Sequence, residues 1–190
     1  PIAPEFSEMR TSLLPGLLKS LQYNLKRQQQ RIRIFETGLV FNDKENLKQE
    51  SHIAGLITGN INEKEWGKES ILTDFYDMKC DVETLLSSLV GARDTEMLPS
   101  ATKILHPRQA VDLIVEGASA GYYGRLHPKI CAELNIPENI YIFEIVINKI
   151  LKKKNISFKK ISKYPSVKRD ISIIISEEIR FEDVMKCAGN

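Results

Sequence analysis

Leucine residues repeat at intervals of three and four between Thr11 and Gln30, which places them on one face of a helix. They are Leu13, Leu14, Leu17, Leu18, Leu21 and Leu25. Ser12 can cap this helix, and Pro15 is tolerated in a first turn because an amide hydrogen there has no helical partner. The basic and amide side chains of residues 26–31 suit the negative end of the helix dipole. The pattern predicts an amphipathic helix with one buried face.

The spacing of apolar residues then changes to that of β-strands. Residues 32–41 are rich in β-branched and aromatic side chains, and Gly38 among them indicates a bulge or a point of close approach. A second strand is predicted at 52–58, after a polar break. Residues 75–89 return to the helical period. We therefore expect a pair of central strands followed by a helix.

The stretch from 93 to 147 alternates short strands with turns and contains one predicted helix, at 128–134. Residues 116–119 are typical of a hairpin turn. The predicted strands are 95–98, 110–115, 121–126 and 141–147. Because the strands follow one another directly or with one helix between them, the pattern favours an antiparallel or mixed sheet of the α+β class over a doubly wound one.

A basic stretch at 149–169 holds nine lysine and arginine residues and no acidic one. Beyond it, residues 170–176 predict a buried strand and residues 181–188 predict the opening of a helix. We therefore divide the chain into three parts: a core at 1–151, a basic linker at 152–163, and the β-α start of a second domain at 164–190.

Composition indicates a globular protein, since 42% of the 190 residues are hydrophobic, and a net charge of +2 is too small to mark a nucleic-acid binder. Cys80, Cys131 and Cys187 are odd in number and form no CxxC pair, which argues against a disulfide framework and a zinc site and favours a cytoplasmic protein. No apolar run approaches the roughly 20 residues of a membrane helix. The chain has no initiator Met, so we expect a fragment of a longer polypeptide.

No residue falls into a recognisable catalytic pattern. His106 and His127 each precede a proline, which places them in extended positions before a turn or a helix. Nucleophile-elbow and phosphate-loop motifs are absent from the sequence. Asp77 and Asp81 lie four residues apart near a predicted helix start, where the dipole favours acids without any cation. The residues alone therefore predict no catalytic, cofactor-binding or metal-binding site.

Several segments nevertheless form a specific series along the chain: 9–18, 34–41, 74–79, 105–107, 121–128 and 164–172. Together they resemble the phenylalanyl-tRNA synthetase beta chain family of bacterial type, and the resemblance covers almost the whole sequence. It implies a class II aminoacyl-tRNA synthetase-like antiparallel sheet flanked by helices, followed by the first β-α unit of a truncated ferredoxin-like anticodon-binding domain.

The resemblance also implies a function. Members of the family are part of a cytoplasmic ligase of protein biosynthesis that attaches phenylalanine to its tRNA with ATP and Mg. The expected partners are an alpha chain, which performs the aminoacylation in an α2β2 heterotetramer, and tRNA. Membrane and DNA partners are not expected. We expect no cofactor in this fragment itself.

One position departs from the pattern of active class II domains. In those domains a strand ends in Phe-Arg, and the arginine grips the ATP α-phosphate. Here Val40 and Phe41 are followed by Asn42, which supplies no fixed charge. The third class II motif, a glycine-rich strand leading into a helix with a second ATP-binding arginine, has no counterpart; the nearest candidate is 121–125. We therefore predict a catalytically inactive domain.

The leading hypothesis is a non-catalytic structural module that docks onto the alpha chain. The alternative is a tRNA-binding module acting through the basic segment 149–169 and the anticodon-binding domain. A third hypothesis, an ATP-using regulatory relative of a synthetase, is disfavoured by Asn42. The candidate subunit-interface residues are Arg10, Asn24 and Arg27. The candidate RNA-binding residues are Lys163, Lys168 and Arg169.

Overall fold

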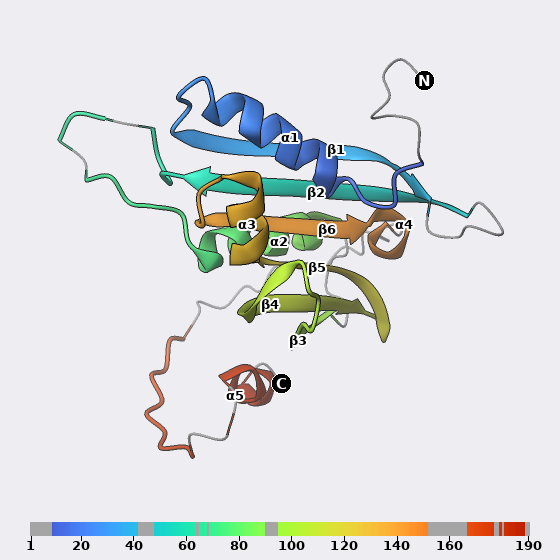
Figure 1. The fold of residues 1–190 in the computed structure, drawn as a ribbon. Helices are drawn as coiled ribbons and strands as arrows, with labels where there is room; N and C mark the ends of the chain where they lie inside the picture. The colour runs from blue at the N-terminus through green and yellow to red at the C-terminus, as the bar shows by residue number, and fades with distance from the viewer. Residues whose placement is uncertain are drawn as a thin grey trace. The chain divides into compact units, whose positions relative to one another are not determined.

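The computed structural model describes residues 9–41, 48–63, 65–67, 69–89, 95–151, 167–176, 179 and 181–188. The chain divides into two compact units, Pro1–Asn155 and Ile156–Asn190. The strands described in the larger unit are β1 (Arg31–Phe41), β2 (Gln49–Gly59), β3 (Thr95–Pro99), β4 (Leu105–Val115), β5 (Ala118–Leu126) and β6 (Ile140–Val146). Its described helices are α1 (Leu14–Leu25), α2 (Phe75–Leu89), α3 (Pro128–Leu134) and α4 (Ile147–Ile150), as Figure 1 shows.

The six strands form one sheet in the order β1-β2-β6-β5-β4-β3, and every neighbouring pair is antiparallel. This confirms the α+β class and selects the antiparallel sheet over the mixed one. The last strand in sequence, β6, lies in the middle between β2 and β5 (Figure 1). A strand in that position is protected on both edges, which suits its almost entirely apolar sequence.

Helix α1 is shorter than the predicted one. It begins at Leu14 and ends at Leu25, so residues 26–31 follow the helix and do not form its last turn. Gln28 has a left-handed backbone with φ of 61°, a conformation incompatible with continuing the helix. Ser12 Oγ accepts a hydrogen bond from the Leu14 amide at 3.1 Å, although Leu13 is the N-cap residue and has no capping side chain.

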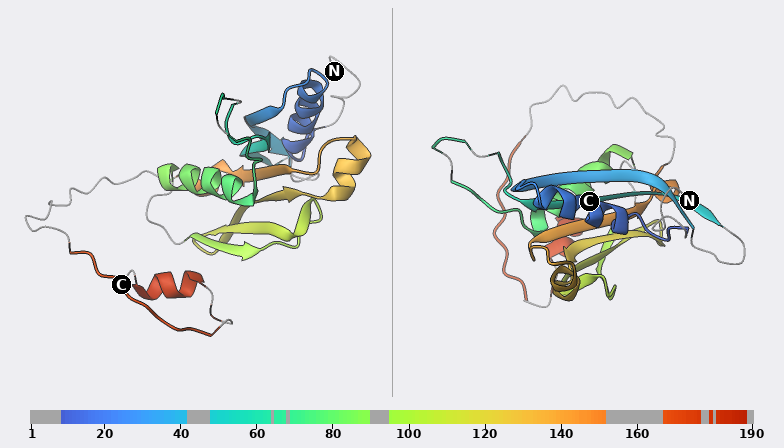
Figure 2. Two further views of the ribbon diagram at one scale, coloured as in Figure 1. Left: turned by 90° about the vertical axis from the view of Figure 1, so that its left-hand side faces the viewer. Right: turned by 45° about the horizontal axis from the view of Figure 1, so that its top comes forward.

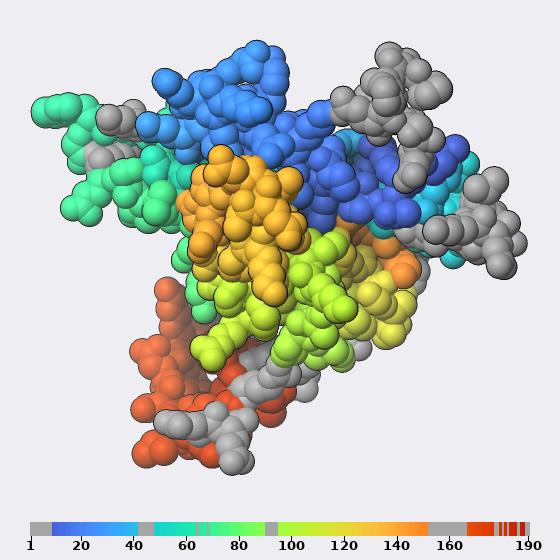
Figure 3. All heavy atoms as spheres, in the orientation of Figure 1, coloured from blue at the N-terminus to red at the C-terminus, as the bar shows by residue number. Residues whose placement is uncertain are grey.

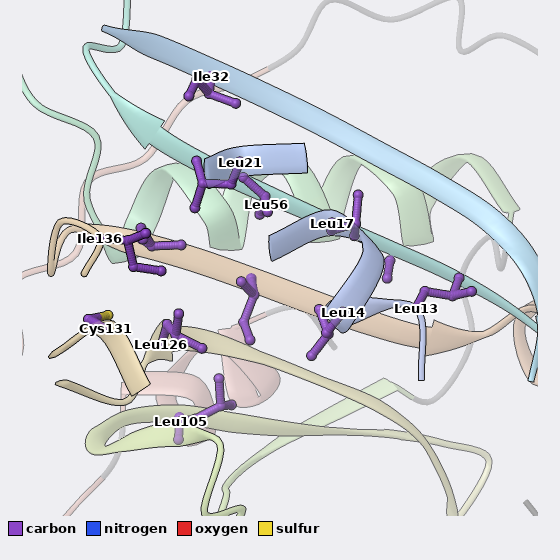
Figure 4. Close-up of a cluster of buried hydrophobic side chains, with 14 of the residues drawn as sticks. Leu13, Leu14, Leu17, Leu21, Ile32, Leu56, Leu105, Leu126, Cys131 and Ile136 are labelled. Carbon is purple, nitrogen blue, oxygen red and sulfur yellow. The ribbon is translucent and has the colours of Figure 1, made fainter. Parts of the chain in front are cut away.

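The predicted leucine face packs onto the sheet. Leu14, Leu17 and Leu21 are buried in a cluster that continues to Leu126 of β5 and Cys131 of α3 (Figure 4). Burying a leucine side chain contributes about 2 kcal/mol, so this cluster is a principal source of stability for the α1 side of the sheet. Helices α1 and α3 lie side by side over this face, which we call the α1 face (Figure 3).

Helix α2 covers the opposite face, which we call the α2 face (Figure 2). It has the predicted bounds, and its buried residues Met78, Val82 and Leu86 pack with Tyr123 and Ile145 of the sheet. Strand β1 is left without this cover. Its side chains on the α2 face therefore include two exposed apolar residues, Phe35 at 73% and Leu39 at 47% exposure.

The strands and their connections differ from the predictions at three places. Strand β1 has no bulge at Gly38, because its register with β2 is unbroken from Arg31 to Phe41. The β4–β5 turn consists of Glu116 and Gly117 alone, both with positive φ, which is typical of a tight hairpin turn. The strand predicted at 110–115 begins earlier, at Leu105.

The smaller unit confirms one prediction and contradicts another. Residues 181–188 form helix α5 (Phe181–Ala188). Residues 170–176, predicted as a buried strand, are in no strand, and Ile174 is fully exposed. A strand needs a hydrogen-bonded neighbour, and the described residues of this unit provide none. Within the described ranges of both units, no helix has the length and apolar character needed to span a membrane.

Candidate functional site

A buried carboxylate lies near the middle of the α1 face. Glu144 of β6 is only 4% exposed. Its Oε2 accepts hydrogen bonds from the hydroxyls of Ser12, at 2.7 Å, and Tyr122, at 3.0 Å. Its Oε1 accepts one from the backbone amide of Leu13 and lies beside Nδ1 of His52, both at 3.0 Å. These five residues are called the Glu144 network.

The sheet register explains why these side chains meet. Tyr122 of β5 and Ala54 of β2 lie directly opposite Glu144, on either side of β6. The small Ala54 leaves space for the side chains around it. A Cβ at Gly121 would overlap the carbonyl oxygen of Glu144, so the glycine permits the close approach of β5 and β6. Packing of the α1 leucines brings the segment before that helix over the carboxylate.

Electrostatics fix the roles of the partners. Burying an ionised carboxylate is costly unless hydrogen bonds replace its hydration, and Glu144 has four such partners. Burial, and secondly the charge of Glu144, raise the pKa of Tyr122 well above its usual range, which keeps the phenol protonated as a donor. His52 serves the carboxylate as a donor from Nδ1, and its Nε2 lies 3.8 Å from Glu50 Oε2. Glu144 is therefore fully engaged and inaccessible as a base or a ligand.

Arg10 joins the segment before α1 to the edge strand β1. Its Nε donates to the carbonyl of Leu39 at 2.9 Å, and its guanidinium pairs with Glu36. The Arg10 carbonyl accepts from the amide of Phe41, also at 2.9 Å. The guanidinium crosses over Gly38, where a Cβ would overlap it. Of the two explanations offered for this glycine, close approach is correct and the bulge is wrong.

The three candidate interface residues are not brought together. Asn24 Nδ2 donates to the carbonyl of Ser20 at 2.8 Å. The Arg27 guanidinium lies 3.4 Å from the centroid of the Tyr23 ring. Asn24 lies in the last turn of α1 and Arg27 lies just after it, whereas Arg10 precedes the other end of the helix, about 18 Å away for a helix of this length.

Of the candidate RNA-binding residues, Lys168 and Arg169 are exposed in the smaller unit. Lys163 lies outside the described residues. Asn42 also lies outside them.

The acidic residues near α2 have structural partners. Asp74 Oδ1 accepts hydrogen bonds from the amides of Tyr76 and Asp77, and Asp77 Oδ2 accepts one in return from the amide of Asp74. Asp81 pairs with Arg33 of β1. Asp74 and Asp77 therefore cap the helix, as the helix-start explanation predicts for Asp77. Asp81 lies beyond the first turn and joins the helix to the sheet instead.

The nearest candidate for the third class II motif is a strand that leads into a helix, as that motif requires. Strand β5 continues through His127 into α3. Its arginine, however, is bound within the chain: Arg125 Nε donates to the Glu138 carbonyl at 2.9 Å, and its guanidinium pairs with the Glu138 carboxylate at 3.2 Å.

The Glu144 network was missed by the sequence analysis, although one signal for it was present. Glu144 is the one acidic residue in an otherwise apolar strand sequence, and buried acids require partners.

The thiol of Cys131 is also buried, and burial raises its pKa, which makes it a poor nucleophile.

An apolar groove of about 360 Å³ lies on the α2 face. Phe35 of β1, Ile53 of β2, Phe143 of β6 and Leu85 of α2 line it, and the Arg33–Asp81 ion pair borders it. The side of β1 that faces away from α1 therefore remains accessible to another protein surface.

Comparisons with known proteins give a consistent result. Residues 1–147 match the family described as the phenylalanyl tRNA synthetase beta chain CLM domain. Proteins named phenylalanine-tRNA ligase beta subunit are similar: that of Buchnera aphidicola is 39% identical over 97% of this chain and 24% of its own length. Those of Methylococcus capsulatus and Pseudoalteromonas translucida are 36% and 40% identical over 100% of this chain and 24% and 25% of theirs. The chain thus spans about a quarter of the length of these relatives.

Proposed function

This chain belongs to the phenylalanyl-tRNA synthetase beta chain family, and from that premise we propose that it is a non-catalytic structural module of a phenylalanine-tRNA ligase. The complete ligase joins phenylalanine to its tRNA in the cytoplasm, with ATP and Mg as substrate and cofactor. In that assembly the chemistry takes place on the alpha chain of an α2β2 heterotetramer.

The proposed architecture has a class II synthetase-like core at 1–151, a basic linker at 152–163 and the start of a ferredoxin-like anticodon-binding domain from residue 164. The six-stranded antiparallel sheet with helices on both faces supports the first part. The division of the chain between Asn155 and Ile156 is in accord with a boundary inside the linker.

The observation that carries the proposal is that the chain fills the α1 face with its own side chains. A sheet face that binds a substrate must present polar groups with unused hydrogen-bonding capacity. In the Glu144 network, Ser12 and Leu13 of the segment before α1 hydrogen-bond to the carboxylate. His52 and Tyr122 hydrogen-bond to it from the neighbouring strands. The carboxylate of Glu144 therefore stabilises the fold and is not free to bind substrate.

The residues present do not fit ATP. Binding its phosphates needs fixed positive charge, and residue 42, after the end of β1, is Asn. Arg10, which contacts strand β1, and Arg125 of β5 are each paired with a carboxylate and a backbone carbonyl of this chain. No step of adenylate formation is therefore assigned to this module.

The groove around Phe35 supports docking onto the alpha chain. Phe35 is 73% exposed in the middle of an edge strand, and aromatic residues in such positions are frequent anchors of protein interfaces. Ile53, Leu85 and Phe143 provide apolar walls beside it. Arg10, Asn24 and Arg27 remain predicted interface residues, and their contacts within the chain neither require nor forbid that role.

Co-purification with the alpha chain tests this function. The chain and a phenylalanyl-tRNA synthetase alpha chain would be expressed together and separated by size-exclusion chromatography with light scattering. We expect a stoichiometric complex. Separate elution of two well-folded proteins would contradict the docking role.

A second candidate function, tRNA binding through the segment 149–169, is supported by the exposure of Lys168 and Arg169. Several phosphate contacts produce a steep fall in affinity with salt. tRNA binding by the chain that persists at physiological salt and falls steeply above it would support this function, whereas a solvated linker would show little binding there.

A further inference from the structure

A polar pocket lies at the outer end of the α1 face, away from the Glu144 network. Its volume is about 480 Å³, within the range of small-ligand sites. The walls come from the β3–β4 connection and from the junction of β5 with α3. The polar residues that line it are Ser100, Thr102, Lys103, His127 and Lys129.

The lining of this pocket offers donors and no carboxylate. Lys103 and Lys129 are both exposed, and within the described residues neither forms an ion pair. Elsewhere in the larger unit, lysines such as Lys48 and Lys79 do pair with carboxylates. The two ammonium groups of the pocket therefore bring an uncompensated positive charge to one place.

His127 is held with a donor available to the pocket. Its Nδ1 accepts a hydrogen bond from the amide of Lys129 at 3.1 Å, so Nδ1 carries no proton. The proton of the neutral ring must then be on Nε2. His127 is thus a cap for α3 on one side of the ring and an N–H donor on the other.

The hydroxyl groups of Ser100 and Thr102 also leave one hydrogen-bond donor for the pocket. Ser100 Oγ accepts from the amide of Thr102 at 3.1 Å and donates to Thr102 Oγ1 at 2.9 Å. The Thr102 oxygen is therefore already an acceptor, and its own proton is left to donate. Thr102, His127 and two lysines all present hydrogen-bond donors, which selects a ligand that only accepts and carries negative charge.

We propose that this pocket binds a phosphate group, and that in the assembled ligase the phosphate belongs to the backbone of RNA. Phosphate oxygens are strong acceptors, and lysine is a common partner for them as a mobile point charge. The assignment to RNA rests on the proposed function, which makes tRNA a substrate of the assembly. Lysines at the rim of an open pocket are suited to backbone contacts that position RNA without reading its sequence.

The test uses the assembled ligase with the full-length beta subunit, comparing wild type with Lys103→Ala/Lys129→Ala. Lys79→Ala is the matched control, because Lys79 lies on α2 and pairs with Glu83. The tRNA dissociation constant is measured between about 50 and about 200 mM salt, where we expect the double variant to bind about tenfold more weakly and its salt slope to be shallower by about 1.5. The control should retain wild-type values.

Binding of inorganic phosphate by equilibrium dialysis distinguishes the sources of the phosphate. If the double variant binds one inorganic phosphate fewer per beta subunit than wild type but binds tRNA with the same affinity, the RNA assignment is overturned and the pocket is a phosphate site for a small ligand. No change in either measurement would overturn the whole proposal. His127→Asn, which keeps a capping acceptor, provides an independent variant with an intact α3 and should also weaken binding. Loss of alpha-chain co-elution in a sample would report failure of the docking role separately.

Discussion

Ser12, just before α1, donates a 2.7 Å hydrogen bond to the buried carboxylate of Glu144 in β6, 132 residues later in the chain. This bond joins the first described segment to the central strand of the sheet. Together with the Leu13 amide it closes the α1 face over Glu144.

Replacing Glu144 with Gln should destabilise the fold. The amide would offer one acceptor oxygen where the carboxylate offers two, so the hydroxyls of Ser12 and Tyr122 would lose their charged acceptor. We expect a loss of about 3 kcal/mol in the free energy of unfolding, measured by urea denaturation. Tyr122→Phe removes one donor and should cost only about 1.5 kcal/mol. Equal stability of wild type and Glu144→Gln would show that the network does not hold the fold together.

Stability should fall in strongly alkaline solution. Burial, and secondly the charge of Glu83, raise the pKa of Tyr123 to about 12. A pKa raised in the folded state gives stability that is present below the unfolded value of about 10 and is lost as pH rises toward the folded value. Between these two pKa values we expect the ionisation of Tyr123 to lower the free energy of unfolding by about 1.4 kcal/mol per pH unit.

The matched variant for this pH dependence is Tyr123→Phe, which keeps the ring against Phe75, 5.5 Å away between centroids. Its unfolding free energy should fall less steeply than that of wild type over the same range. Identical slopes would exclude Tyr123 as a source of the alkaline loss.

The cap of α3 gives a separate stability prediction. His127 accepts a hydrogen bond from the Lys129 amide, so His127→Ala should cost about 1 kcal/mol. His127→Asn supplies another good capping acceptor and should retain most of that stability. Thermal unfolding of both variants measures the difference. Two equally destabilised variants would mean that the imidazole contributes through packing and not through the cap.

Phe35→Glu should weaken association with the alpha chain, because it places a charge in the apolar groove. We expect at least about a tenfold rise in the dissociation constant, measured by surface plasmon resonance. Trp66→Glu is the control, since Trp66 is fully exposed in the β2–α2 connection and does not line the groove. Asn24→Ala/Arg27→Ala tests the other predicted surface. A loss confined to that double variant would move the interface from the groove to the end of α1.

Local patterns predicted two of the helices well, because the evidence for each lies within one segment. The helices at 75–89 and 128–134 have the predicted bounds, since an apolar period or a His-Pro start specifies them locally. The strand predicted at 170–176 failed for the opposite reason. Its apolar residues have β propensity, but a strand exists only when another segment pairs with it.

The Glu144 network could not be predicted for a similar physical reason. Its members come from four separate segments, and only the order and register of the sheet bring them together. The acid in an apolar strand indicated that a partner was needed, but not that Ser12 or His52 would be the partner. Gly38 was correctly recognised as a special position, while the choice between bulge and close approach required the location of Arg10.

We propose that this module uses its buried carboxylate to hold its own fold and does not use ATP. Calorimetric titration of Mg-ATP into the chain in the absence of the alpha chain tests this most directly. We predict no binding of ATP with micromolar affinity, because Glu144 is fully engaged and Arg10 and Arg125 are paired within the chain. Saturable binding of ATP with micromolar affinity would contradict this account.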